Sequence, residues 1–250
     1  RQPEQISHVV VRFAGDSGDG MQLTGDRFTS VSALFGNDLS TFPDYPAEIR
    51  APAGTVNGVS SFQVHISDHD ITTPGDAPAI LVAMNPAALR SELHHLVDGG
   101  TVIVNTDAFE ERNLTKAGYR SDPLTDGTLD RYTVYEVPMT SLTKDAVAPL
   151  GVKPRDAERS KNFFALGLIS WMYTRPTEPT LTWIDEKFAK QPQVAAANRA
   201  AFATGHAFGE TAELFEHSYS VRPAEHEPGT YTKITGNTAL AWGLVGAGQR

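Results

Sequence analysis

The stretch that decides the fold is Phe13-Ala14-Gly15-Asp16-Ser17-Gly18-Asp19-Gly20-Met21-Gln22. This glycine-rich turn joins an apolar run, His8–Phe13, to a segment with helical periodicity, Gln22–Phe35. The glycines permit positive φ and let a ligand approach the backbone closely. The following helix presents unpaired N–H groups and the positive end of its dipole, which favour a negative group. The turn is therefore either an anion site, with phosphate the first candidate, or a turn that only packs a strand against a helix.

Composition bounds the class of protein. The 250 residues carry a formal net charge of −9 and no segment concentrates Lys and Arg, so we expect no nucleic-acid partner. No apolar stretch approaches the ~20 residues that cross a bilayer. We therefore expect no membrane association and a cytoplasmic location. The sequence contains no cysteine, which excludes disulfides and iron–sulfur ligation by thiolates of these residues.

Short apolar runs alternate with helical stretches through the first half of the chain. Residues 62–66 alternate apolar and polar side chains, as in a half-exposed strand, whereas residues 79–84 are continuously apolar, as in a central strand. Residues 107–130 form a polar excursion, and residues 142–215 are mostly helical in pattern. We predict an α/β fold, a Rossmann-like three-layer domain with a mainly parallel sheet.

The end of the chain has a different composition. Residues 218–230 hold two prolines and several charges, which is typical of a linker. We predict a first domain over residues 1–217 and the start of a second domain over residues 231–250. The apolar segment 235–248 has little sequence left to cover it, so we expect the chain to end early in that second domain. Because the first residue is Arg1 rather than Met, we expect the natural start to be missing.

Metal ligands have little support in the sequence. His94 and His95 are adjacent and point apart on a helix. His206 and Glu210 share a helix face, but such a pair is more often a surface contact than a ligand set. We therefore predict no metal site.

Three other polar residues stand out by their surroundings. Arg50 lies in a proline-rich loop, Tyr45–Gly54, that follows a short predicted strand. Open α/β sheets place ligand contacts at this edge, so Arg50 either reaches a phosphate or pairs with Glu48 at the surface. Asn162 and Asn198 stand in apolar or alanine-rich helices, where an amide needs a backbone end or a ligand as partner.

Four motifs, in this order, resemble the gamma domain of the 2-oxoacid:ferredoxin oxidoreductase family. They are Gly15–Gly20, Tyr45–Arg50, Leu81–Asn85 with Gly99–Ile103 behind it, and Asn162–Gly167. The resemblance covers about residues 8–215. Beyond it, residues 235–243 resemble the opening of the family's alpha domain, which carries a segment for substrate and thiamine diphosphate. A gamma domain fused ahead of an alpha domain is the arrangement of the alpha subunit in family members that act on 2-oxoglutarate.

The resemblance implies an activity. It is the oxidative decarboxylation of a 2-oxoacid, with 2-oxoglutarate the first candidate, to succinyl-CoA, CO2 and reduced ferredoxin. Thiamine diphosphate, Mg2+ and a [4Fe-4S] cluster would act in the complete complex, and these residues alone are not expected to be active. The implied partners are a beta subunit that carries thiamine diphosphate and the cluster, a second alpha subunit in a heterotetramer, and ferredoxin.

For the gamma domain the resemblance implies a wall that binds coenzyme A and a subunit interface, with no catalytic residue. Backbone N–H groups and a guanidinium suit nucleotide phosphates, and amides suit polar groups of the ligand. The chain departs from the family's frequent Gly-Gly-Gln-Gly by placing Asp19 beside the anion site. We expect this carboxylate to point away or to brace the loop by accepting backbone N–H bonds. The implied coenzyme A contacts are Ser17, Gly18, Asp19, Gly20, Met21, Arg50, Asn162 and Asn198.

Two other functions remain open on the sequence. One is a free-standing Rossmann-like module that holds a dinucleotide. The second strand has no acid at its end to hold a ribose, because Asp38 and Asp44 flank that strand, and this weakens the dinucleotide interpretation. The other is a structural domain that only buttresses the subunit carrying thiamine diphosphate.

Replacing Arg50 tests its assignment to a phosphate. A guanidinium on a phosphate contributes ~1.5–3 kcal/mol through charge-assisted hydrogen bonds, so Arg50→Ala in the complete complex should raise the KM for coenzyme A roughly ten- to a hundredfold. Decarboxylation without coenzyme A should stay nearly intact. The measurement is steady-state kinetics with coenzyme A varied at saturating 2-oxoglutarate, and an unchanged KM would remove Arg50 from the site.

Overall fold

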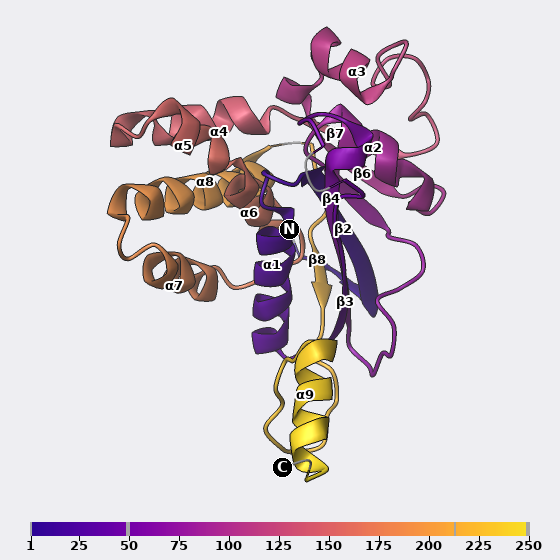
Figure 1. Ribbon diagram of the computed structural model, residues 1–250, viewed down its shortest axis with the longest axis vertical. Helices are drawn as coiled ribbons and strands as arrows, with labels where there is room; N and C mark the ends of the chain where they lie inside the picture. Colours follow the sequence, from indigo (N-terminus) through magenta and orange to yellow (C-terminus); the bar gives the residue numbers. More distant parts are fainter. Residues whose placement is uncertain (1, 49–50, 213, 249–250) are drawn as a thin grey trace.

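The computed structural model describes residues 2–48, 51–212 and 214–248. A six-stranded sheet in the order β3-β4-β2-β5-β6-β7 forms the centre, and β1 pairs with β8 beside it (Figure 1). The strands are β1 (Glu4–Ile6), β2 (His8–Asp16), β3 (Asp38–Asp44), β4 (Val59–Ser67), β5 (Ile80–Ala83), β6 (Thr101–Asn105), β7 (Thr133–Val137) and β8 (Tyr219–Val221). The helices are α1 (Met21–Phe35), α2 (Pro86–Glu92), α3 (Glu111–Ala117), α4 (Met139–Val147), α5 (Pro154–Arg159), α6 (Lys161–Met172), α7 (Glu178–Lys187), α8 (Pro192–Thr211) and α9 (Gly236–Gly246).

The central sheet is mainly parallel, which confirms the predicted α/β class. Strands β2, β5, β6 and β7 run parallel to one another. Strand β4 is the exception, because it runs antiparallel between β2 and β3. Hydrophobic periodicity reports which side chains are buried and not which way a strand runs, so the direction of β4 was not visible in the sequence.

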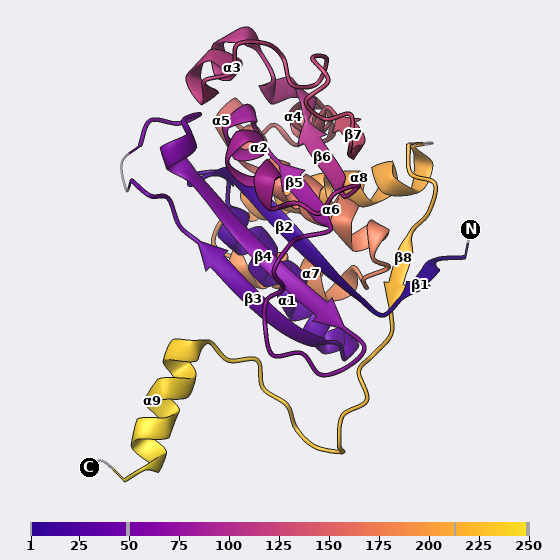
Figure 2. The same ribbon diagram turned by 90° about the vertical axis from the view of Figure 1, so that its right-hand side faces the viewer.

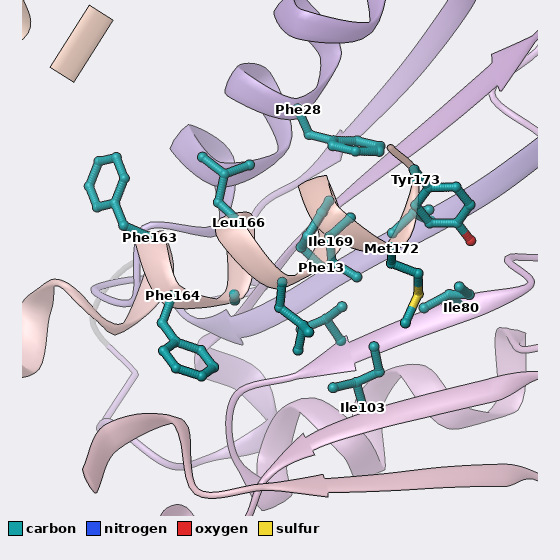
Figure 3. Packing of buried hydrophobic residues seen from close by; sticks show 14 of the residues in the cluster. Phe13, Phe28, Ile80, Ile103, Phe163, Phe164, Leu166, Ile169, Met172 and Tyr173 are labelled. Carbon is teal, nitrogen blue, oxygen red and sulfur yellow. The ribbon is translucent and has the colours of Figure 1, made fainter. Parts of the chain in front are cut away.

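Two hydrophobic layers enclose the sheet and make the fold three-layered. On one face, Val11 and Phe13 of β2 pack with α1, α6 and α8, and the ring centroids of Phe13 and Phe28 are 6.0 Å apart. Figure 3 shows this layer, with Phe28 and Tyr173 on either side of the end of α6. On the other face, Ala14 belongs to a cluster that includes residues of α2 and α3. Alternation along β2 therefore supplies both layers.

Helices α6 and α8 cross at two glycines with their backbones in contact. A Cβ added at Gly167 would lie 2.1 Å from the carbonyl oxygen of Phe202, and one added at Gly205 would lie 2.0 Å from that of Phe164. No larger residue fits at either position without separating the helices. The contact fixes α6 against α8, and α6 is buried over nearly its whole length.

The polar excursion at residues 107–130 has more structure than its composition indicated. It contains the short helix α3, which ends at Gly118 in the left-handed conformation. Ala117 and Leu129 are buried in the cluster on the α2 face. The excursion is therefore a cover for one edge of the sheet rather than a solvated loop.

The beginning of the segment with linker composition belongs to the folded domain. Residues 219–221 form β8, parallel to β1. The Asn37 side chain donates to the carbonyl oxygens of Val221 and Arg222 at 3.3 and 2.6 Å, and Arg175 donates to the Asn37 oxygen at 2.6 Å. The division into domains at this segment stays a prediction, but its first residues are held at the end of α1.

Helix α9 follows this segment and lies apart from the sheet (Figure 2). None of its residues is buried, and Leu240, Trp242 and Val245 are 65%, 57% and 76% exposed. The Thr235 hydroxyl caps its N-terminus by accepting from the Thr238 N–H at 3.2 Å. Within the described ranges, no helix combines the length and the apolar character needed to cross a membrane.

The glycine crossing generates a stability prediction. Gly205→Ala places a methyl group against the backbone of α6, which cannot rotate away, so we expect a loss of about 3 kcal/mol in the free energy of unfolding. The control is Gly243→Ala in α9, where an added Cβ meets nothing within 4 Å. This variant should be neutral or stabilising by up to ~1 kcal/mol. Denaturant unfolding measures both, and equal effects of the two variants would contradict the crossing.

Candidate functional site

The glycine turn connects the carboxyl end of β2 to the N-terminus of α1. Of its three glycines only Gly20 uses the positive φ that glycine permits, at 76°, and Gly15 and Gly18 do not. A Cβ added at Gly20 would also lie 2.5 Å from Nδ2 of Asn162. Gly18 faces open space, since nothing lies within 4 Å of an added Cβ. Gly20 therefore makes the turn possible, while Gly18 keeps its apex accessible.

The N-terminus of α1 has no internal partner for its first N–H groups. No side chain caps it and its first turn holds no acid. The first hydrogen bond to the turn runs from the Thr24 N–H to the Gly20 carbonyl at 3.0 Å, so the N–H groups of the preceding helical residues lack helical acceptors. The Met21 side chain is buried in the core and contributes only its backbone to this surface. The combination suits an anion.

Asp19 braces the turn by accepting a backbone N–H bond, which is one of the two arrangements that we expected for its carboxylate. Its Oδ2 accepts the Asp16 N–H at 3.0 Å, and its Oδ1 pairs with Nζ of Lys161 at 2.9 Å. Both side chains of the ion pair are mostly buried, at 15% and 14% exposed. The carboxylate is thus occupied on both oxygens, and Lys161 compensates its charge beside the anion site.

The two helix asparagines lie in different positions relative to the turn. Asn162, at the start of α6, is 6% exposed and places its amide nitrogen against Gly20. Its Oδ1 accepts the N–H of Phe163 at 2.9 Å, which leaves Nδ2 without a hydrogen bond to any described residue. Asn198 of α8 contacts the residue just before α6 instead of the turn. Its Oδ1 accepts the Ser160 hydroxyl at 2.8 Å. Asn162 thus faces the turn, and Asn198 supports the segment that carries it.

Arg50 lies outside the described residues, so its assignment stays a prediction. The loop that contains it meets the glycine turn at described positions. Oδ2 of Asp16 accepts the Gly54 N–H at 2.9 Å, and the Ser17 N–H donates to the Gly58 carbonyl at 3.2 Å. These bonds place the far end of the loop beside the turn.

Sequence reasoning missed a cluster of cations at the turn. A cavity of about 130 Å3 is lined by Gly18, Asp19, Arg155, Glu158, Arg159 and Lys161. The signal in the sequence was the run of charges just before Asn162, at residues 153–161. Mixed signs made this run resemble a solvated helix face, and only the fold of α5 against the turn shows where its arginines lie.

Burial shapes the electrostatics of Asp16. Desolvation is the largest influence and raises the pKa of its carboxyl above the ordinary value, and the charge of Asp19 raises the pKa further. Hydrogen bonds from Asn85 and Gly54 and the charge of Lys161 oppose this shift. In the described part of the chain, no cluster of three or more His, Asp and Glu side chains is arranged to hold a metal ion.

Comparisons with known proteins place the chain in a family. A family model described as pyruvate ferredoxin/flavodoxin oxidoreductase matches residues 10–208. The chain is 58% identical over 246 residues to the 2-oxoglutarate oxidoreductase subunit KorA of Mycobacterium tuberculosis, which covers 98% of this chain and 38% of that relative. It is 34% identical over 106 residues to the 2-oxoglutarate synthase subunit KorC of Methanothermobacter thermautotrophicus, over 42% of this chain and 53% of the relative. The chain thus spans about two fifths of the length of the first relative.

Solved structures share the fold. The 2-oxoglutarate:ferredoxin oxidoreductase from Magnetococcus marinus, with 2-oxoglutarate, coenzyme A and succinyl-CoA bound, has a TM-score of 0.66 at 22% identity, over 88% of this chain and 34% of that one. The gamma subunit of a keto/oxoacid ferredoxin oxidoreductase from Geobacter sulfurreducens has a TM-score of 0.56 at 21% identity, over 82% of this chain and 99% of that one. The fold is therefore that of gamma-type domains of 2-oxoacid oxidoreductases. The chain belongs to the pyruvate ferredoxin/flavodoxin oxidoreductase family.

The raised pKa of Asp16 predicts a stabilising variant. Because the folded state takes up the proton more readily than the unfolded chain, the stability contributed by this group is present at acid pH and lost as pH rises through the folded pKa. Asp16→Asn keeps an oxygen for the Gly54 N–H and removes the buried charge. We expect a higher midpoint of thermal unfolding at pH 7, with a difference from the original chain that shrinks towards pH 4.

Asp126→Asn is the matched control. A hydrogen bond from Ser121 is the largest influence on this exposed carboxyl and lowers its pKa, so removal of its charge has no burial cost to relieve. We expect its thermal midpoint at pH 7 to be unchanged or lower. A midpoint that falls in Asp16→Asn at pH 7 would contradict the interpretation of Asp16.

Proposed function

We propose that this chain is part of a subunit of a 2-oxoglutarate:ferredoxin oxidoreductase and that the surface around its glycine turn binds the nucleotide end of coenzyme A. The name of the Mycobacterium tuberculosis relative and the family match support the reaction. The ligands in the Magnetococcus marinus structure support coenzyme A as the molecule bound. In the proposed reaction coenzyme A accepts the acyl group left after decarboxylation of the 2-oxoacid.

One observation carries the assignment of the site. The uncapped N-terminus of α1, the buried amide of Asn162 and the cations beside Gly18 meet at one turn. Backbone N–H groups accommodate singly charged phosphates, and guanidinium and ammonium groups attract them further. An amide donor fits a phosphate or ribose oxygen. The donors at this surface are those that a nucleotide diphosphate requires.

The residues of this chain supply binding rather than chemistry in this proposal. Thiamine diphosphate, Mg2+ and a [4Fe-4S] cluster are assigned to the complete complex, with a beta subunit and ferredoxin as partners. The sequence offers no thiolate for a cluster, since it contains no cysteine. The role of the turn is to hold the carrier of the acyl group in place, and cytoplasm remains the proposed location.

The sheet topology argues against the runner-up, a dinucleotide module. In such a module the strand after the first helix lies next to the strand of the glycine turn, and the acid at its end holds a ribose. Here antiparallel β4 separates β3 from β2. The expectation that this strand ends without an acid is wrong, because β3 runs from Asp38 to Asp44. The Asp44 carboxylate, however, lies 3.5 Å from the buried guanidinium of Arg12.

Removing the Asn162 amide tests the site. Asn162→Ala in the complete enzyme should weaken coenzyme A binding about tenfold, the loss expected for hydrogen bonds to a charged group. Binding of the 2-oxoacid should stay the same, and calorimetric titration of each ligand measures both. The control is Asn113→Ala, which removes an amide of α3 that donates to the Ala108 carbonyl at 2.9 Å.

The outcomes separate the alternatives. Coenzyme A binding that is unchanged in Asn162→Ala and in Arg50→Ala would favour the buttressing role of the domain. Tight binding of a nicotinamide dinucleotide in place of coenzyme A would favour the runner-up.

A further inference from the structure

The cation-lined cavity beside Gly18, here called the arginine cavity, is distinct from the helix N-terminus next to it. Its walls are Gly18, Asp19, Arg155, Glu158, Arg159 and Lys161. The cations come from α5 and the first residue of α6, whereas the free N–H groups belong to α1. The turn therefore has two neighbouring sets of donors for anions, one of backbone amides and one of charged side chains.

The charges of the arginine cavity do not cancel. Asp19 is paired with Lys161 at 2.9 Å, so these two contribute little net charge. Arg159 makes only a long contact of 4.0 Å with Asp156, and Arg155 forms no ion pair with any described residue. Glu158 also lines the cavity and offsets one of the two arginines. The residues that line the cavity therefore carry one net positive charge, while Asp156, which is not part of the lining, lies 4.0 Å from Arg159.

The size of the cavity limits what it can take. At about 130 Å3 it is well below the ~300–1,000 Å3 of pockets that enclose a drug-sized ligand. It therefore suits one small charged group and not a base or a sugar. Guanidinium groups bind two oxygens of a phosphate at once, and a phosphomonoester carries about −1.5 to −2 charges at pH 7.

We propose that the arginine cavity binds the 3′-phosphomonoester of coenzyme A, while the amides of the glycine turn take its diphosphate. This inference rests on the proposed function of the site. Coenzyme A differs from its dephospho form only by that phosphomonoester, so Arg155 and Arg159 determine the specificity between the two forms. They are binding residues with no part in the decarboxylation.

The experiment compares two ligands on the complete enzyme by isothermal titration calorimetry. Coenzyme A should bind at least tenfold more tightly than dephospho-coenzyme A. In the double variant Arg155→Gln/Arg159→Gln, coenzyme A should bind ten- to a hundredfold more weakly, and dephospho-coenzyme A should bind as before. Retained binding of the dephospho form also shows that the variant is folded.

The control is Arg112→Gln/Arg120→Gln, which removes two exposed arginines in and after α3 and should leave both affinities unchanged. Competition by inorganic phosphate separates a general anion site from a nucleotide site. Phosphate should weaken coenzyme A binding only at concentrations far above those of the nucleotide.

Two results would overturn the inference. The first is a ratio of the two dissociation constants, for coenzyme A and its dephospho form, that is the same in the original enzyme and in the variant. In that case the arginine cavity does not bind the phosphomonoester, although the proposed function stands. If neither form binds the original enzyme, the proposed function fails as well.

Discussion

The contact of α6 with α8 is the constraint on which the site depends. Gly167 and Gly205 let the two backbones touch, and this contact fixes the position of α6 along α8. The first residues of α6 are Lys161 and Asn162, so the same contact sets where an ammonium and an amide reach the glycine turn. Asn198 stands seven residues before Gly205, two helical turns away on the same face of α8, and there it holds Ser160 just ahead of α6. A shift of either helix would move the ligand-facing groups together.

Most charged side chains near the turn form hydrogen bonds or ion pairs within the protein. Asp16 and Asp19 accept N–H groups of the loops rather than facing the open side, and Lys161 neutralises the second of them. On the face of β2 that packs against α2, the buried Arg12 pairs with Glu92 at 2.8 Å. It also reaches Asp44, which precedes the loop containing Arg50. An isolated buried charge costs several kcal/mol, so these pairs tie the loop positions to the core. The cations left over are those of the arginine cavity.

Helix α9 gives the domain a second kind of surface. It is apolar around its circumference, and none of its residues is buried. A helix that is hydrophobic on all sides is stable only when it is covered. The chain therefore combines a polar turn at the carboxyl end of β2 with an apolar helix that follows β8.

The sequence by itself determined the α/β class, the place of the glycine turn between a strand and a helix, and the bracing role open to Asp19. These follow from local periodicity, glycine spacing and side-chain chemistry, which act over a few residues. Only the tertiary structure decided that β4 is antiparallel, that Gly20 alone needs positive φ, and that Asn162 faces the turn while Asn198 supports it. It also decided that Arg155 and Arg159 line a cavity beside the turn. The physical reason is that these features depend on residues far apart in the chain. Strand β4 takes its direction from pairing with β2 and β3, and α5 meets the turn through residues more than a hundred positions away, and no local pattern records such contacts.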